Sequence, residues 1–109
     1  MPESFDRGAL TEAVYYILLS VHEPMHGYAI MQNIERLTGG RVSLGPGTLY
    51  GAINALVQKR WIAAVDEGQD LRKKSYVITE AGRAAIDGEI VRLKELIQNF
   101  ESVLGGDAK

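Results

Sequence analysis

The stretch GPGTLYGAINALVQKR, residues 45–60, predicts a helix with two contrasting faces. Pro46 suits the first helical position, where its missing N–H costs no hydrogen bond, and Gly45 suits the N-cap. Apolar residues recur at helical spacing and are expected to face a core: Leu49, Ala52, Ile53, Leu56 and Val57. The other face is polar and uncharged, with small residues at its start: Gly47, Thr48, Tyr50, Gly51, Asn54 and Gln58. Taken alone, such a face is better explained as a solvated helix surface than as a binding site.

A β-hairpin is expected directly after this helix, because the periodicity changes. WIAAV (61–65) and SYVIT (75–79) are short and rich in β-branched or aromatic residues. They flank DEGQDLRKK (66–74), a charged connection with a turn glycine. Thr79 can then cap a following helix, and Glu80 is favourable in its first turn.

The C-terminal helix carries a heptad pattern. Its apolar residues are spaced alternately four and three apart: Ile86, Ile90, Leu93, Ile97, Phe100 and Leu104. One interpretation packs this seam on the first helix of the same domain. However, about 25 residues of helix span roughly 37 Å, which exceeds what a small three-helix core covers. We therefore expect part of the seam to meet a second subunit and form a homodimer.

Two helices are expected before residue 45. An apolar stripe predicts the first from about Gly8 to Val21: Leu10, Val14, Ile17, Leu18 and Val21. A second stripe ends at a glycine stop, Thr38-Gly39-Gly40, and contains Ile30, Met31, Ile34 and Leu37. The order of helix, helix, helix, hairpin and long helix predicts a mainly α fold, a winged helix-turn-helix. We expect residues 1–79 to form this domain and residues 80–109 the dimerisation helix with a frayed tail.

The segment HEPMH, residues 22–26, spells the HExxH zinc motif but is predicted to be a turn. That motif needs a continuous helix, in which Pro24 costs about 3 kcal/mol. The chain has no cysteine and only these two histidines, so we expect no metal and no cofactor. Pro24 would fit the first turn of the second helix, and Gly27 would allow close packing. His26 and Tyr28 then lie near the start of that helix, where a phosphate can dock; burial of Tyr28 is an equal alternative.

Composition limits the class of protein. The 109 residues suit one small domain, the absence of cysteine excludes a disulfide framework, and no apolar run approaches 18 residues. The N-terminus lacks the plan of a signal peptide, so a cytoplasmic protein with no membrane partner is expected. The net charge is −2, yet residues 35–83 carry eight basic and five acidic residues. A local basic face of this kind favours a polyanionic partner.

These elements together predict binding to double-stranded DNA. The third helix can enter a major groove and offer Asn54 and Gln58 to base edges, while Thr48 and Tyr50 offer hydroxyls to phosphates. In the hairpin loop, Arg72, Lys73 and Lys74 can reach the backbone; Tyr28 is a weaker candidate. Each residue has a plainer explanation, since polar helix faces and basic turns are usually just solvated. The order of the elements is what favours DNA.

Three segments resemble the PadR family of transcriptional regulators: HGYAI (26–30), GPGTLYGAINAL (45–56) and RKKSYVITEAG (72–82). The resemblance runs from about Leu10 to Leu104 and is closest to the short subfamily with one C-terminal helix. It implies a dimeric winged-helix repressor whose third helix reads DNA and whose last helix makes the dimer. A two-fold dimer should recognise an inverted-repeat operator. We expect no enzyme activity, because the sequence offers no base–nucleophile pair, glycine-rich phosphate loop or carboxylate cluster. The resemblance also implies that Thr48 and Tyr50 begin the recognition helix and that Arg72 to Lys74 form the wing.

The chain departs from the family pattern at two positions. Gly51 stands where the family often has proline. Arg60 stands where the family usually has glycine, so either the turn differs or strain of about 1 kcal/mol is tolerated. Trp61, next to it, is expected to pack at the base of the wing.

Some relatives bind flat apolar effectors between the C-terminal helices of the dimer, using an aromatic residue there. Phe100 is the aromatic residue of this helix, with Leu93 nearer its middle, so a small hydrophobic effector is a hypothesis. Two rival functions stay open on the sequence. One is a winged-helix protein-interaction module without DNA binding, which the net charge allows; the other is a metalloenzyme based on HEPMH.

Overall fold

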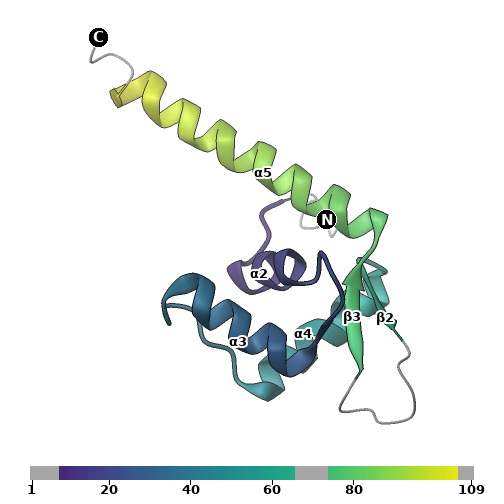
Figure 1. The fold of residues 1–109 in the computed structure, drawn as a ribbon. Helices are drawn as coiled ribbons and strands as arrows, with labels where there is room; N and C mark the ends of the chain where they lie inside the picture. The colour runs from purple at the N-terminus through teal and green to yellow at the C-terminus, as the bar shows by residue number, and fades with distance from the viewer. Residues whose placement is uncertain (1–7, 66–73, 106–109) are drawn as a thin grey trace.

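The computed structural model describes residues 8–65 and 74–105, which form a mainly helical fold with a small sheet (Figure 1). In chain order the elements are α2 (Glu12–Ser20), β1 (Met25–His26), α3 (Gly27–Thr38), α4 (Pro46–Lys59), β2 (Ile62–Val65), β3 (Ser75–Ile78), α5 (Glu80–Phe100) and the π-helical turn η2 (Glu101–Gly105). Helix α5 runs across one side of the molecule and projects well beyond the other elements. The predicted winged helix-turn-helix with a long C-terminal helix is confirmed.

The core lies where the three N-terminal helices meet the sheet. Its fully buried side chains are Ile17, Leu18 and Val21 of the α2 region, Ile30 and Ile34 of α3, Leu49, Ile53 and Leu56 of α4, and Ile62 of β2. The predicted apolar face of α4 is thus confirmed. The first helix begins at Glu12 rather than about Gly8, because Thr11 caps it by accepting a hydrogen bond from the Val14 N–H.

The end of α4 resolves the question raised by Arg60. Arg60 is the C-cap and adopts a left-handed conformation, with φ of 67°. The Arg60 N–H donates to the Val57 carbonyl and the Trp61 N–H to the Leu56 carbonyl, each at 3.0 Å. Gly39 ends α3 in the same way, at φ of 62°. The turn is therefore the one that glycine favours, and the chain tolerates the strain of a side chain in it.

The sheet has the strand order β1-β3-β2, and β1 was not predicted. Met25 pairs with Tyr76 and His26 with Ser75, both antiparallel. This pairing delays the start of α3 to Gly27, so Pro24 precedes a strand and the prediction that it lies in the first turn of the helix was wrong. Proline fits there because it has no N–H to donate to a ladder.

Helix α5 uses one apolar stripe for two environments. Near its start, Ile86 is 5% exposed and belongs to the core of its own domain, so its assignment to a subunit interface is corrected. Ile90 and Leu93 are half-buried. Further along, Ile97 is 57% exposed and Phe100 59%. In the described ranges, no helix is long and apolar enough to cross a bilayer.

The buried carboxylate of Glu89 links helix α5 to the segment that precedes α2. Glu89 is 5% exposed and accepts a hydrogen bond from the Leu10 N–H at 3.2 Å. Arg92 donates two further hydrogen bonds to it, at 2.9 and 2.7 Å. The bonds from Arg92 hold the pKa of Glu89 below its usual value, despite the opposing effect of burial. Thr79 caps the same helix as predicted, because its hydroxyl oxygen accepts from the Gly82 N–H.

Replacing Arg60 with glycine should stabilise the domain. A left-handed conformation costs a residue with a side chain about 1–2 kcal/mol, and glycine would remove this strain. Glycine is also freer in the unfolded state, and this offsets about half of the stability gained. We expect Arg60→Gly to raise the free energy of unfolding by about 1 kcal/mol in urea titration, allowing for both effects. Arg60→Ala is the control, because it removes the guanidinium but keeps the strain. An Arg60→Gly variant less stable than Arg60→Ala would show that the backbone at residue 60 is unstrained, because only the unfolded-state freedom of glycine would then distinguish the two.

Candidate nucleic-acid interface

Helix α4 presents its polar face to solvent because its apolar face is fixed in the core. Thr48, Gly51, Asn54 and Gln58 are exposed on the side opposite to the buried leucines and isoleucine. The helix contains no aspartate or glutamate. A face with amide and hydroxyl groups and no anions can approach DNA without repulsion from the phosphates.

The four main helices differ in how their N-termini are capped. Thr11 and Thr79 cap α2 and α5 with their side chains. The N-cap residues of α3 and α4, His26 and Gly45, make no side-chain capping bond. The first turns of α3 and α4 therefore lack a side-chain hydrogen-bond partner, and the helix dipoles favour an anion there.

Tyr50 joins the starts of these two helices. A Cβ built on Gly27 would lie 2.3 Å from the Tyr50 hydroxyl oxygen, so the tyrosine ring lies directly over this glycine. Tyr50 is nevertheless 39% exposed. Burial raises the pKa of the neighbouring Tyr76, and proximity to Tyr50 adds to the effect. Gly27 thus permits the close packing that was predicted, and its partner is the candidate phosphate contact Tyr50.

The hairpin brings the root of the wing to the same region. Strands β2 and β3 pair from Ile62 with Ile78 to Val65 with Ser75, and half-buried Lys74 precedes β3. The starts of α3 and α4 and the open end of the hairpin lie on the side of the molecule away from α5 (Figure 1). Tyr28, 63% exposed, belongs to the first turn of α3, so its buried alternative was wrong. Arg72 and Lys73 lie outside the described residues.

Several cations of the basic central region have partners within the chain. Arg41 forms two hydrogen bonds with Glu12, at 3.1 and 3.0 Å, and thereby lowers the pKa of that carboxyl. Arg36 donates to the Asn33 side chain, and Lys59 lies 5.0 Å from the centre of the Trp61 ring. Part of the positive charge in residues 35–83 is therefore engaged in contacts within the chain. The sequence alone did not reveal these contacts.

The histidines of HEPMH lie on different elements. His22 follows α2, where its Nδ1 contacts the Leu18 carbonyl at 3.1 Å, and His26 belongs to β1. The helical spacing that the zinc motif requires is not formed. Among residues 8–65 and 74–105, no three histidine, cysteine, aspartate or glutamate side chains are grouped to hold a metal. Sequence reasoning missed the contact between His26 Nδ1 and Ser75 Oγ, at 2.9 Å, because it depends on the unexpected strand pairing.

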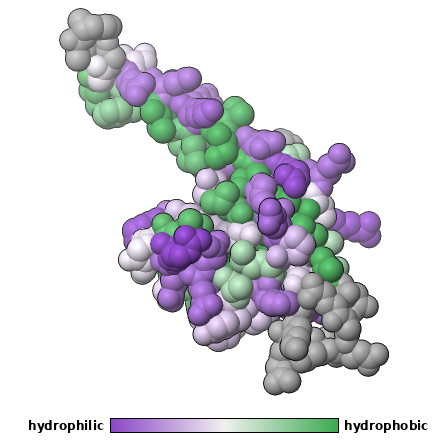
Figure 2. Space-filling view, in the orientation of Figure 1, coloured by the Kyte–Doolittle hydropathy of each residue, from purple (hydrophilic) through white to green (hydrophobic). Residues whose placement is uncertain are grey.

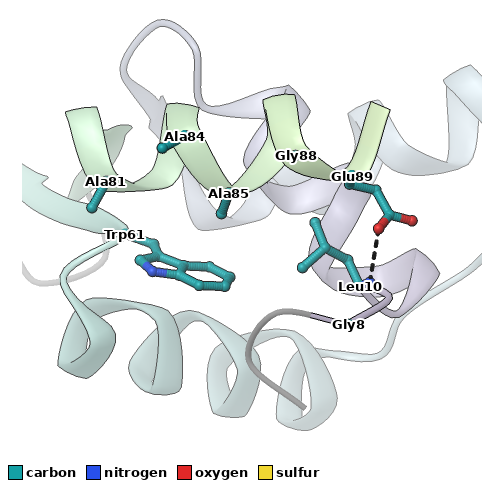
Figure 3. A pocket seen from close by; sticks show the side chains of 8 residues that line it. All are labelled: Gly8, Leu10, Trp61, Ala81, Ala84, Ala85, Gly88 and Glu89. Carbon is teal, nitrogen blue, oxygen red and sulfur yellow. Dashed lines mark hydrogen bonds between the residues drawn. The ribbon is translucent and has the colours of Figure 1, made fainter. Parts of the chain in front are cut away.

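A cavity of about 340 Å³ lies beside α5 (Figure 3). The indole of Trp61 forms one wall, and the small residues Ala81, Ala84, Ala85 and Gly88 of α5 form the opposite one. Trp61 also packs against the core, as expected for the base of the wing. The charged group at the cavity, Glu89, already bonds to Leu10 and Arg92.

Comparison with known proteins agrees with this geometry. Residues 16–88 match the transcriptional regulator PadR-like family. The chain is 41% identical over 82 residues to an uncharacterised 37.1 kDa protein in transposon TN4556 of Streptomyces fradiae; the match covers 74% of this chain and 23% of that protein.

Two solved structures have a similar fold. One is a PadR family transcriptional regulator from Eggerthella lenta, with TM-score 0.71, 22% identity and coverage of 95% of this chain and 88% of that one. The other is a PadR-like transcription factor from Bacteroides fragilis, with TM-score 0.71, 23% identity and coverage of 94% and 96%.

The packing of Tyr50 on Gly27 can be tested by a double-mutant cycle. Gly27→Ala should destabilise the domain by about 1–2 kcal/mol, because the new methyl group overlaps the tyrosine ring. In a Tyr50→Ala background the same change should stabilise it by about 0.5–1 kcal/mol, since alanine is the better helix former. Urea titration of the four proteins measures both values. The same sign in both backgrounds would show that the two residues are not in contact.

Proposed function

Because the chain belongs to the PadR-like family of transcriptional regulators, which are non-enzymatic DNA-binding proteins, we propose that it binds an inverted-repeat operator as a homodimer and represses transcription. The observation that carries the proposal is the acid-free polar face of α4, exposed beside two helix starts that lack side-chain caps. A bound dimer occupies the operator and excludes the transcription machinery.

In this proposal α4 lies in the major groove. Its 14 residues form a helix about 21 Å long. The major groove, about 12 Å wide, is broad enough to admit an α-helix. Asn54 and Gln58 contact base edges, since both carry a donor and an acceptor. Phosphate contacts come from side chains around the helix starts and from the wing: Tyr28, Thr48, Tyr50, Arg72, Lys73 and Lys74.

The homodimer is supported by the exposed apolar stripe of α5. Large apolar side chains gather along its projecting part, as Figure 2 shows in green. The exposed ones are Val91, Leu96, Ile97, Phe100, Val103 and Leu104. Of the predicted interface residues, Ile90 and Leu93 lie where the stripe leaves its own domain, and Ile97, Phe100 and Leu104 continue it into solvent. Pairing of two such helices would remove this surface from water.

We extend the proposal to a small apolar or aromatic effector that binds between the two α5 helices and lowers affinity for DNA. Its support is the family resemblance together with the 59% exposure of Phe100, an aromatic side chain within the stripe. An effector placed there would act on DNA binding by changing the angle between the two helix-turn-helix units.

The sequence-reading role of α4 can be tested by selecting operators from random duplexes and titrating variants at one fixed salt concentration. Asn54→Ala should lose about 1–3 kcal/mol on the selected operator and almost nothing on random DNA, because base contacts alone carry sequence information. Tyr50→Phe, the control, should weaken both to a similar extent. If no inverted repeat emerges, or Asn54→Ala leaves the preference unchanged, α4 is not the reading helix.

The dimer can be tested with two matched pairs of substitutions on α5. Ile97→Lys with Phe100→Lys should give a folded monomer, because these side chains are exposed in the single chain. Asn99→Lys with Ser102→Lys adds the same charge on the opposite side of the helix and should leave the dimer intact. Sedimentation at micromolar concentration distinguishes the two. A monomeric wild-type protein would contradict the proposed interface.

A further inference from the structure

We propose that His26 contacts a backbone phosphate of bound DNA through its Nε2, and that Ser75 is the positioning residue for its ring. This inference rests on the proposed DNA binding and adds a contact that the family match does not assign.

The position of His26 brings three DNA-facing elements together. It lies in the edge strand β1 and is the N-cap of α3. Its strand partner Ser75 directly follows Lys74 at the root of the wing. The next residue in the chain, Gly27, carries the ring of Tyr50 from α4. A phosphate at this junction would be within the reach of groups from α3, α4 and the wing.

The hydrogen bond to Ser75 fixes the orientation of the imidazole. Ser75 is 3% exposed, and its Oγ lies 2.9 Å from His26 Nδ1. Among the described residues, Ser75 is the one hydrogen-bond partner of the ring, whereas the residue as a whole is exposed. The bond therefore holds Nδ1 against the sheet, and Nε2, which has no hydrogen-bond partner among the described residues, is the ring nitrogen left for a ligand.

The chemistry of this arrangement suits an anion in both protonation states. When the Ser75 hydroxyl donates to Nδ1, the proton of the neutral ring is on Nε2, which can then donate to a phosphate oxygen. When the ring is protonated, Nδ1–H donates to Ser75 and Nε2–H donates with a positive charge, which makes a stronger hydrogen bond. An anion at Nε2 would also lie near the positive end of the α3 dipole.

Ionisable groups from the preceding turn, α3, α4 and β3 neighbour His26. They are Glu23 in the preceding turn, Tyr28 on α3, Tyr50 on α4, and Lys74 and Tyr76 at β3. Histidine ordinarily changes its charge between about pH 5 and 8, and a phosphate favours the charged form. Affinity for DNA should therefore increase as pH falls through this range.

The experiment measures binding of a labelled random-sequence duplex by fluorescence anisotropy, at about pH 6 and about pH 8, over a range of salt concentrations. Wild-type protein should bind about tenfold more tightly at the lower pH, as expected for a hydrogen bond that gains a charge. His26→Gln should lose this difference, and at low pH its log–log salt slope should be smaller in magnitude by about 0.9. His26→Lys should bind tightly at both pH values, because its charge does not change. Ser75→Ala should reduce the pH effect, since the ring is no longer held.

His22→Gln is the matched control, since it removes the other histidine of the chain, and it should keep the full pH effect. The inference is overturned if the effect survives in His26→Gln, or if it is lost in His22→Gln. A structural role of His26 would lower affinity equally at both pH values and would not be rescued by lysine. Absence of any DNA binding by the wild-type protein would overturn the proposed function itself, a result distinct from binding without pH dependence.

Discussion

The hydrogen bonds on both edges of strand β3 are the constraint on which the remaining structure depends. One edge pairs with β1 and the other with β2. At the end of the strand, the Ile78 N–H donates to the Val21 carbonyl at 2.8 Å and the Thr79 N–H to the Trp61 carbonyl at 2.9 Å. Residues 75–79 thus join the end of α2, the start of α3, the end of α4 and the cap of α5. The orientation of α4 relative to the wing follows from these bonds.

The sequence predicted the features that depend on local patterns. The stripe of α4, Pro46 at its first position, Gly39 at the end of α3 and Thr79 at the start of α5 were all recognisable, because each rule involves residues within one or two turns. Strand β1 was not predicted, because two residues carry no periodicity and their partners are about 50 positions away. The contacts of Tyr50 with Gly27 and of Glu89 with Leu10 depend on the fold in the same way.

The apolar stripe of α5 shows why a single period can be ambiguous. The spacing of four and three residues is the same at Ile86 and at Phe100, yet one side chain is in the core and the other is 59% exposed. Periodicity reports which side of a helix is apolar, whereas length determines how much of that side the domain covers. A small domain has little core to offer, and burial of the remaining stripe against a second copy would add the apolar contact that one chain lacks. Glu89 lies where the domain ceases to cover α5. Its hydrogen bonds with Leu10 and Arg92 satisfy the buried carboxylate at this edge of the core.

Net charge is a poor guide to the binding surface of this chain. The total of −2 hides a basic central region, and part of that region is in turn neutralised by contacts such as Arg41 with Glu12. What distinguishes the proposed surface is the placement of donors. These donors are the first turns of α3 and α4, which lack side-chain caps, the tyrosine hydroxyl held at Gly27 and, in our proposal, Nε2 of His26. As dipoles or weak donors they would cost little to bury against phosphate. Because packing within the domain already holds these groups in place, they would lose little conformational entropy on binding. A protein of slight negative charge could therefore bind DNA through the surface that we propose.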